Sequence, residues 1–338
     1  MPGVDLARGL AVLGMLAAHL LTVEPFDPRE PATWVDVVNG RSSILFAVLA
    51  GVSLALVTGG AAPVDDRSLR DARRRITVRA IVLWIIGIAL ILTGVPVYVI
   101  LPAYALLFLL ALPLLGLHAG VLWTIALALA IVMPWVQPVL AALPVWDGPA
   151  GGDLALVLGW HYPATLWIVF VVAGLAAARS DLRRTRTQVL LLVGGALAAA
   201  ASYAVAGSTG DFGESAGVVW SAQAHSGGLW EVWGSGGFAL AVLGGAILLC
   251  RTPATWIVLP LRAVGSMPLT AYVGQIVAWA VAAAILLGGT ADLMAFRALD
   301  PLPVFVVVTM LFCTAWAVVL GRGPLERLLA WITRIVAR

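Results

Sequence analysis

The first 21 residues, MPGVDLARGLAVLGMLAAHLL (1–21), decide the fold class, because they form a long apolar run with Arg8 near its start and His19 near its end. A run of this length is close to what an α-helix needs to cross the bilayer core. Arg8 and His19 are eleven residues apart, close to three turns, so both side chains project from one helix face about 16 Å apart along the axis. Ionisable groups inside a membrane segment are costly and by default mark a functional site.

The rest of the chain continues this apolar character. Of its 338 residues, 62% are hydrophobic and only 11% are charged, which excludes a soluble domain. The sequence therefore predicts an all-α, polytopic membrane protein that forms one integral domain over residues 1–338. Ten transmembrane helices are predicted, at 8–23, 43–58, 79–93, 98–117, 120–142, 162–178, 188–206, 236–250, 268–289 and 303–320.

The last residues, GPLERLLAWITRIVAR (323–338), predict an amphipathic helix at the membrane surface. Leucine and isoleucine side chains alternate there at helical spacing with Arg327, Arg334 and Arg338. Helices of this pattern lie in the interface plane with the apolar face toward lipid, so membrane lipids are expected partners.

All 20 basic residues are arginine, and their distribution predicts the orientation. Arg29, Arg41 and Arg297 fall on one side of the predicted topology, and the remaining arginines fall on the other. By the positive-inside rule, the crowded side is cytoplasmic, so both termini are expected inside the cell and the chain is placed in the plasma membrane. The basic pI thus reports topology first, and nucleic acid is not an expected partner.

The opposite, extracytoplasmic side is predicted to carry acids and aromatic rings. Carboxylates accept hydrogen bonds from hydroxyl and amine groups, and apolar ring faces stack on sugars, so this side suits a hydroxyl-rich or amine-bearing ligand. The connection 207–235, GSTGDFGESAGVVWSAQAHSGGLWEVWGS, is Gly- and Ser-rich and is predicted to be a long loop. Loops of this length are usually functional or disordered.

The four histidines divide by position. His118 and His161 are interpreted as hydrogen-bonded packing residues at the membrane surfaces, which is the usual role of a lone interfacial histidine. His225 precedes Glu231 by six residues, and the pair is a candidate lining of the acceptor site. His19 differs, because its depth makes an idle imidazole costly.

The two cysteines, Cys250 and Cys313, both fall inside predicted spans. A disulfide is therefore not expected, and neither is a metal site. Both are interpreted as small packing residues.

The pattern of Arg8, ten residues and His19 resembles the signature of the transmembrane acyltransferase superfamily. The stretch VDLARGLAVLGMLAAH is similar to the first span of its YeiB-like branch, which includes the heparan-alpha-glucosaminide N-acetyltransferases. Further similarities run through the chain in order: Asn39-Gly40-Arg41 with Leu45-Phe46 and Gly51, Tyr162-Pro163 to Gly174, Gly265 with Leu269, Thr270, Tyr272 and Gln275, and Gly323-Pro324-Leu325-Glu326. The segment 100–104, Ile-Leu-Pro-Ala-Tyr, departs from it by lacking the polar residues that many relatives show before the tyrosine.

The resemblance implies an enzyme that moves an acyl group, usually acetyl, from cytoplasmic acetyl-CoA as co-substrate to an extracytoplasmic glycan or amino sugar. His19 is the expected general base. The candidate acetyl-CoA ligands are Arg8, Arg79 and Arg262. The candidate acceptor-binding residues are Asp36, Asn39, Arg41, His225, Glu231, Tyr272 and Gln275. The last two are also candidates to orient His19 or bind the acyl carbonyl, and a homodimer is a further expectation.

Two other classes of protein fit part of the sequence. A transporter or a lipid or glycan flippase would use His19 as a proton relay. No inverted repeat relates residues 1–170 to 171–338, which disfavours this class. A non-catalytic scaffold explains the spans but leaves Arg8 and His19 unexplained.

Overall fold

The computed structural model describes residues 1–27, 29–208 and 214–336, and in that part of the chain every regular element is a helix. The longer helices are α1 (Pro2–Leu20), α2 (Arg41–Val57), α3 (Asp66–Ile91), α4 (Leu101–Ala111), α5 (Ala119–Ala141), α7 (Ala164–Arg179), α8 (Thr185–Ser208), α10 (Leu229–Leu249), α12 (Pro268–Leu287), α14 (Leu302–Val319) and α15 (Pro324–Val336). Shorter elements are η1 (Pro31–Val37), η2 (Leu112–Gly116), η3 (Pro144–Trp146), α6 (Gly151–Leu158), α9 (Glu214–Val219), η4 (Pro253–Thr255), α11 (Leu259–Ser266) and α13 (Leu293–Ala298).

This architecture confirms the prediction of an all-α, polytopic membrane protein. Among the described residues, seven helices are long and apolar enough to cross a membrane, and two shorter apolar helices cover 101–116 and 164–179. The remaining predicted span, 79–93, falls in the second half of α3, whose first half is charged and extends beyond the apolar run. The predicted amphipathic tail is α15, although residues 337–338 of that prediction lie outside the described part.

The predicted loop 207–235 is shorter than expected. Helix α9 interrupts it, and α10 begins at Leu229 because the aromatic and apolar residues there continue the helical pattern of the following span. Residues 209–213 of this prediction lie outside the described residues.

Glycines at the crossing points allow the central helices to pack closely. A Cβ atom at Gly265 of α11 would lie 1.7 Å from the carbonyl oxygen of Asp5 in α1. A Cβ atom at Gly174 of α7 would lie 1.8 Å from the carbonyl oxygen of Val48 in α2. Small residues at such contacts let backbones approach, which is how membrane helices associate without a hydrophobic driving force.

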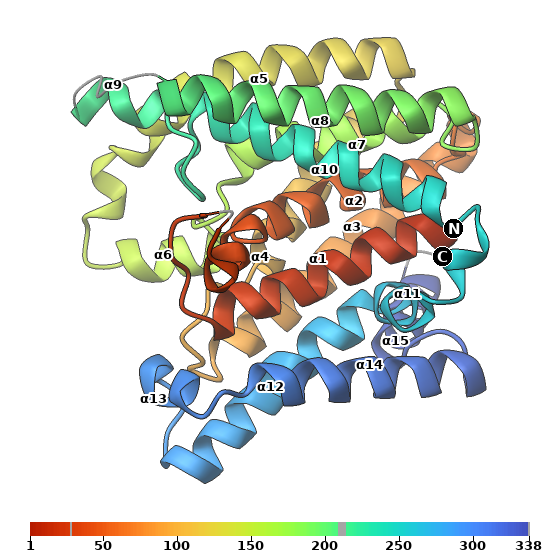
Figure 1. Cartoon of the computed structure of the whole chain (residues 1–338). Helices are drawn as coiled ribbons and strands as arrows, with labels where there is room; N and C mark the ends of the chain where they lie inside the picture. Colours follow the sequence, from red (N-terminus) through yellow and green to blue (C-terminus); the bar gives the residue numbers. More distant parts are fainter. Residues whose placement is uncertain (28, 209–213, 337–338) are drawn as a thin grey trace.

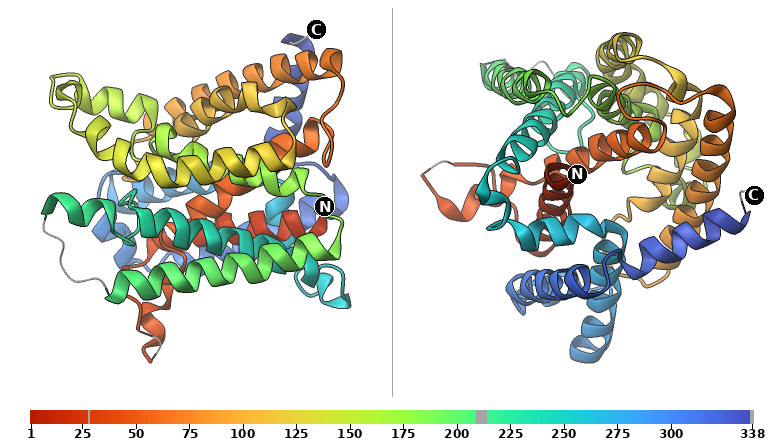
Figure 2. Two further views of the ribbon diagram at one scale, coloured as in Figure 1. Left: turned by 90° about the horizontal axis from the view of Figure 1, so that it is seen from above. Right: turned by 90° about the vertical axis from the view of Figure 1, so that its right-hand side faces the viewer.

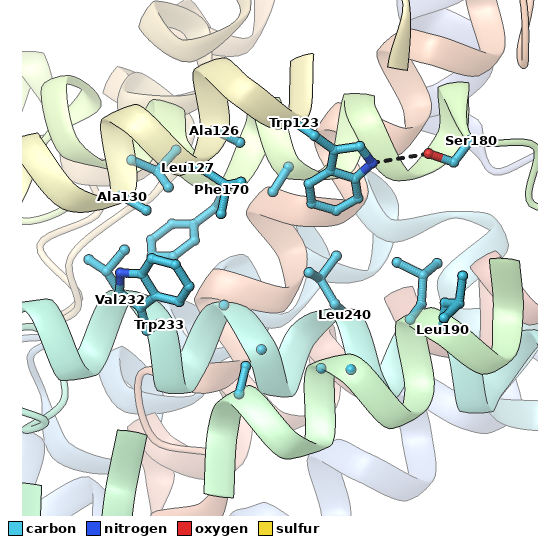
Figure 3. Close-up of a pocket in the computed structure, with 18 of the residues that line it drawn as sticks. Trp123, Ala126, Leu127, Ala130, Phe170, Ser180, Leu190, Val232, Trp233 and Leu240 are labelled. Atoms are coloured by element: carbon cyan, nitrogen blue, oxygen red, sulfur yellow. Dashed lines mark hydrogen bonds between the residues drawn. The ribbon is translucent and has the colours of Figure 1, made fainter. Parts of the chain in front are cut away.

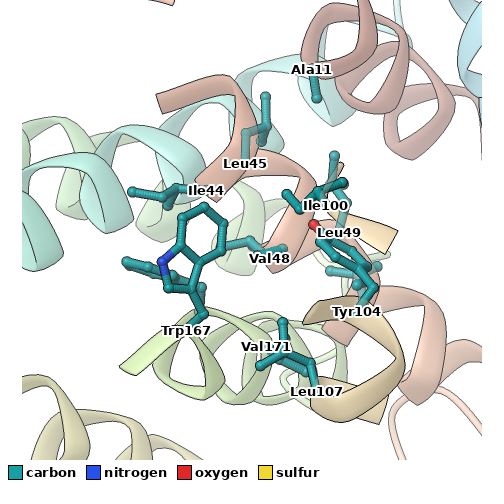
Figure 4. Packing of buried hydrophobic residues seen from close by; sticks show 14 of the residues in the cluster. Ala11, Ile44, Leu45, Val48, Leu49, Ile100, Tyr104, Leu107, Trp167 and Val171 are labelled. Carbon is teal, nitrogen blue, oxygen red and sulfur yellow. The ribbon is translucent and has the colours of Figure 1, made fainter. Parts of the chain in front are cut away.

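The core surrounds α2 and its contacts with α1, α4 and α7. Figure 4 shows Ile44, Val48 and Leu49 of α2 packed among Tyr104 of α4 and Trp167 of α7. By contrast, α14 buries only Cys313 and exposes much of its apolar surface, as a helix facing lipid does. Cys250 is half-buried, and both cysteines are free thiols.

The bundle has two distinct ends, which lie along the horizontal direction of Figure 1 and of the left view in Figure 2. The first residues of α1 lie at the same end as α11 and α15, and we call this the arginine-rich end because Arg75, Arg79 and Arg322 also lie there. The end of α1 lies at the opposite end, near α6 and α13 (Figure 1). Helix α1 thus connects the two ends through the middle of the molecule.

Candidate functional site

Helix α1 positions Arg8 and His19. Pro2 suits the first turn of a helix, and Asp5 in that turn complements the helix dipole. The Arg8 guanidinium donates to Asp5 Oδ1 at 2.9 Å and to Ser53 Oγ of α2 at 2.8 Å. These bonds fix the Arg8 side chain at the arginine-rich end while His19 lies near the other end of the same helix.

A cavity of about 370 Å³, which we call the Arg8 cavity, surrounds the Arg8 side chain. Arg79, Tyr104, Tyr272 and Glu326 are among its other polar lining residues. The carboxylate of Glu326 accepts hydrogen bonds from the backbone N–H groups of Leu269 and Thr270 at the start of α12 and from the Thr270 hydroxyl. The acid therefore anchors α15 to α12 beside the cavity.

A larger cavity of about 860 Å³, which we call the arginine cavity, lies next to the Arg8 cavity. The two linings share Val57, Arg79, Ser266 and Glu326. The other charged residues that line the arginine cavity are Asp71, Arg75, Arg322 and Arg334. Four arginines around one cavity make it suited to an anion with several phosphates.

The three predicted acetyl-CoA ligands are therefore not equivalent. Arg8 lines the Arg8 cavity and Arg79 lines both cavities, with its guanidinium 6.0 Å from the ring centre of Phe108. Arg262 lines neither, because its side chain turns back to donate to the carbonyl and the hydroxyl of Thr255. The structure brings Arg8 and Arg79 together and leaves Arg262 apart.

A small cavity of about 20 Å³, which we call the His19 cavity, adjoins the His19 side chain. Tyr272 lines both this cavity and the Arg8 cavity, so the three cavities follow one another from the arginine-rich end to His19. Tyr272, Gln275 and Trp279 all face the His19 cavity from α12, since residues four and seven apart share one helix face. The predicted pair Tyr272 and Gln275 therefore does lie beside His19.

Two of these α12 side chains already have partners. The hydroxyl of Tyr272 accepts a hydrogen bond from the backbone N–H of Ile100 at 3.2 Å. The side-chain amide of Gln275 donates to the hydroxyl of Thr309 at 3.3 Å. Both polar groups are held in place before any ligand binds.

Arg297 of α13 holds the backbone of His19. Its Nε and Nη2 atoms donate to the His19 carbonyl oxygen at 3.0 and 2.8 Å. This carbonyl is one of the last of α1, which lack partners within the helix, so Arg297 caps α1 and also fixes the position of His19. In the sequence, Arg297 bears only on topology, because a separation of 278 residues leaves no local signal of this contact.

His161 and His225 form an aromatic group near this end. The His161 ring stacks on Tyr98 at 3.7 Å between centres, and His225 lies 4.9 Å from His161. His225, although exposed, has a lowered pKa because of partial desolvation and because His161 and His19 lie within electrostatic reach. The structure therefore places His161, interpreted from sequence as a packing residue, beside the predicted acceptor residue His225.

Glu231 stabilises the loop that carries His225. Its buried carboxylate accepts hydrogen bonds from the backbone N–H groups of His225 and Gly227 at 2.6 and 2.7 Å and from the Ser226 hydroxyl at 3.2 Å. His225 itself adopts a left-handed conformation, with φ of 63°. The predicted pair does meet, but through the His225 backbone rather than through its ring.

A polar cavity of about 710 Å³, which we call the Asp36 cavity, opens beside this loop. It is lined by Asp36, Asn39 and Arg41, as well as Glu24 and Gln223. Arg41 donates to the Asp36 carbonyl at 2.7 Å and to the Tyr203 hydroxyl at 2.8 Å, and Asn39 donates to Asp36 Oδ1 at 3.3 Å. These three predicted acceptor residues therefore form one wall of a real cavity.

An apolar groove of about 380 Å³ lies between α5, α7, α8 and α10 (Figure 3). Trp123, Phe170 and Trp233 line it, and the Trp123 indole donates to the Ser180 hydroxyl at 3.0 Å (Figure 3). The groove shares no lining residue with the cavities beside Arg8 and His19. Within the described residues, no group of three or more His, Cys, Asp or Glu side chains is arranged to hold a metal ion.

Comparison with known families gives two matches. Residues 1–209 match the family described as heparan-alpha-glucosaminide N-acetyltransferase, catalytic, and residues 173–336 match a family described as a protein of unknown function, DUF418. No curated protein and no solved structure matches the chain. The first match contains Arg8, His19 and Asp36, and the second contains Tyr272, Gln275 and Arg297.

Proposed function

Because the chain belongs to the heparan-alpha-glucosaminide N-acetyltransferase catalytic family, we propose that it transfers an acetyl group from acetyl-CoA to an amino sugar or glycan across the membrane. The observation that carries the proposal is the order of the cavities. The arginine cavity, the Arg8 cavity and the His19 cavity adjoin one another through shared side chains, and the Asp36 cavity lies at the opposite end.

The arginine cavity suits the nucleotide part of acetyl-CoA. Arg75, Arg322 and Arg334 would bind its phosphates through charge-assisted hydrogen bonds, which are stronger than neutral ones. Arg8 and Arg79 would bind a phosphate of acetyl-CoA where the Arg8 cavity adjoins the arginine cavity. Arg8 is suited to this role because Asp5 and Ser53 already hold its guanidinium in one position.

The length of α1 suits the pantetheine arm. Arg8 and His19 are about 16 Å apart along the axis, and an extended pantetheine arm spans a distance on the order of 15–20 Å. A phosphate near Arg8 would therefore place the thioester near the His19 cavity. The apolar lining of that cavity, which includes Val12 and Leu16, suits an acetyl methyl group.

His19 would then act as the general base. The acceptor amine or hydroxyl attacks the thioester carbonyl carbon, and the neutral imidazole takes its proton as the new bond forms. The carbon–sulfur bond breaks next, and the imidazolium returns the proton to the departing sulfur, giving free CoA and the acetylated acceptor. Direct transfer of this kind needs one positioned base and no acyl-histidine intermediate.

The acceptor would bind in the Asp36 cavity. Carboxylate oxygens of Glu24 and Asp36 would accept hydrogen bonds from hydroxyl or ammonium groups, and the Asn39 amide would supply a further polar contact. His225 and Glu231 act on this cavity indirectly, because the loop that they stabilise contributes Gln223 and Ala224 to its lining.

The proposed orientation follows from the arginine distribution. The arginine-rich end would face the cytoplasm, where acetyl-CoA is available, and the Asp36 cavity would open to the outside of the plasma membrane. Both termini would then be cytoplasmic.

The proposal is tested by purifying the protein in lipid nanodiscs and measuring acetyl-CoA binding and CoA release. We expect saturable acetyl-CoA binding and CoA release that increases when D-glucosamine is added. His19→Asn is the control for release catalysed by the site rather than by a contaminant. A protein that binds no acetyl-CoA but moves a lipid or glycan between leaflets would instead be a flippase.

A further inference from the structure

Trp279 has a buried hydrogen-bond donor without an acceptor. The residue is 2% exposed, and within the described residues its Nε1 atom has no hydrogen-bond partner. An indole N–H can only donate, so no rearrangement of its own proton satisfies it. Buried polar groups are nearly always paired, and an exception in a native structure requires an explanation.

The position of Trp279 suggests what the missing partner is. Its side chain lines the His19 cavity, together with Tyr272 and Gln275 from the same face of α12. The Tyr272 hydroxyl and the Gln275 amide are engaged with Ile100 and Thr309, respectively. Of these three α12 side chains, Trp279 is the one whose polar atom has no hydrogen-bond partner at all.

Helix α13 contacts both the Trp279 ring and the backbone of His19. Trp279 stacks on Phe296 of α13, with ring centres 5.0 Å apart and planes 13° from parallel, and Phe296 is itself buried. The next residue, Arg297, donates to the His19 carbonyl. Two consecutive residues of α13 therefore fix the indole and the backbone of His19 relative to each other. Preorganised donors of this kind stabilise developing charge effectively, because they need no reorganisation during the reaction.

We propose that Trp279 is a catalytic residue whose indole N–H stabilises the oxyanion formed from the acetyl thioester. The proposal rests on the acetyl transfer proposed above. As the acceptor oxygen or nitrogen bonds to the carbonyl carbon, the carbonyl π electrons move to oxygen, and His19 takes the acceptor proton. The indole N–H donates to that oxygen until the carbon–oxygen double bond re-forms, the carbon–sulfur bond breaks and the sulfur takes the proton from His19.

A single trapped water is the competing explanation. A volume of about 20 Å³ is enough for one water molecule, which would satisfy the indole without any role in transfer. The two explanations differ in one respect. Only the proposed catalytic role places the thioester carbonyl within reach of the indole.

The experiment compares wild type with Trp279→Phe, which removes the N–H and keeps an aromatic ring against Phe296. A second variant replaces Trp279 with 3-benzothienylalanine, in which sulfur stands in place of the N–H and the ring shape is kept. Carbonyl-¹³C acetyl-CoA is bound to each protein without acceptor, and isotope-edited infrared difference spectra report the carbonyl stretch. Steady-state kinetics with D-glucosamine follow on the same samples. Trp123→Phe, in the apolar groove, is the matched control.

We expect the bound carbonyl of wild type to absorb at lower frequency than that of both Trp279 variants, because a hydrogen bond weakens the double bond. We expect kcat to fall by about a hundredfold or more, as for other oxyanion donors, with the KM for acetyl-CoA changed by less than about threefold. Trp123→Phe should behave as wild type does. An active wild type whose band and kcat match those of the benzothienyl variant would overturn the inference alone. Wild-type protein that binds no acetyl-CoA would overturn the proposed function and this inference together.

Discussion

The two ends of helix α1 differ in the space around their polar side chains. Arg8 lines a cavity of about 370 Å³ that adjoins the arginine cavity of about 860 Å³, whereas the cavity beside His19 is about 20 Å³ and has a mostly aromatic and aliphatic lining. The first environment suits a large anion and the second suits a group of only a few atoms. In the proposed reaction, α1 would therefore separate donor binding from the transfer step by its own length.

The largest effect is expected at the His19 end. His19→Asn removes the base but keeps a polar side chain of similar size, so kcat should fall by about a hundredfold or more. Acetyl-CoA affinity, measured by isothermal titration calorimetry, should stay within a few fold of wild type, because the substitution leaves the arginine cavity and the Arg8 cavity unchanged. Full transferase activity in this variant would remove the histidine from the reaction.

The next largest effect is expected at the Arg8 end of α1, where acetyl-CoA affinity rather than kcat should change. Arg8→Ala deletes a charge-assisted hydrogen bond and should weaken acetyl-CoA binding by about 1.5–3 kcal/mol, or roughly ten- to more than a hundredfold. Arg262→Ala is the matched control, since Arg262 bonds to Thr255 and lines neither cavity. Equal losses of affinity in the two variants would show that general positive charge, rather than the Arg8 position, holds the donor.

Arg297 sharpens the comparison because it acts on His19 without lining its cavity. Arg297→Gln should lower kcat by about tenfold, because small displacements of a catalytic group are costly, and should leave the KM for acetyl-CoA nearly unchanged. Arg297→Lys should recover part of the loss. Arg29→Gln, an exposed arginine of the same end, serves as control. A parallel rise in KM would place Arg297 in donor binding.

A smaller effect, on stability and acceptor affinity, is expected from Glu231→Ala. The substitution leaves partly buried backbone donors of His225 and Gly227 without an acceptor, which should cost about 1–3 kcal/mol and lower Tm. The KM for glucosamine should rise, because the loop lines the Asp36 cavity, while acetyl-CoA affinity stays constant. Ser226→Ala removes two 3.2 Å contacts, one to Glu231 and one from the Gly228 N–H, but keeps the Glu231 carboxylate, so it should change both quantities less.

The smallest effect concerns pH. The pKa of His225 is lowered in the folded protein by partial desolvation and then by its neighbours His161 and His19, so the unfolded chain binds more protons as pH falls below about 6.5. The contribution of this residue to stability is thus present above that pH and is lost on acidification. Because the side chain is exposed, the decrease in Tm should be modest, and His225→Gln should reduce it. His118→Gln, a substitution at the arginine-rich end, should leave the decrease in Tm on acidification unchanged.

The sequence predicted the fold well because membrane helices are specified locally. An apolar run of sufficient length is enough to place a span, and the arrangement of Arg8 and His19 follows from their spacing on one helix. The helical periodicity of α12 also predicts a third residue on the face that carries Tyr272 and Gln275. Trp279 follows Tyr272 by seven residues and Gln275 by four, so it shares their face and was identifiable in principle.

Other features of the site depend on contacts between distant segments. The hydrogen bonds from Arg297 to His19 join the two ends of the chain, and no local pattern marks them. The role of Glu231 was similarly hidden, since spacing predicted its proximity to His225 but not that its carboxylate binds backbone N–H groups. The position of Arg262 away from the cavities results from a local turn to Thr255, which charge counting does not detect.

The most direct test of the account asks whether the acetyl group crosses from the arginine-rich end to the other end. The protein, with Cys250 and Cys313 replaced by serine and a cysteine introduced at Ser68, is reconstituted into liposomes that contain D-glucosamine. Because Ser68 lines the arginine cavity, an impermeant maleimide is applied only to a separate sample of these liposomes, where it measures how many molecules expose the arginine-rich end. Radiolabelled acetyl-CoA is then added outside only. The account predicts acetylglucosamine inside the liposomes, in proportion to the molecules labelled at position 68. Product that forms only when acetyl-CoA and glucosamine are on the same side would contradict it.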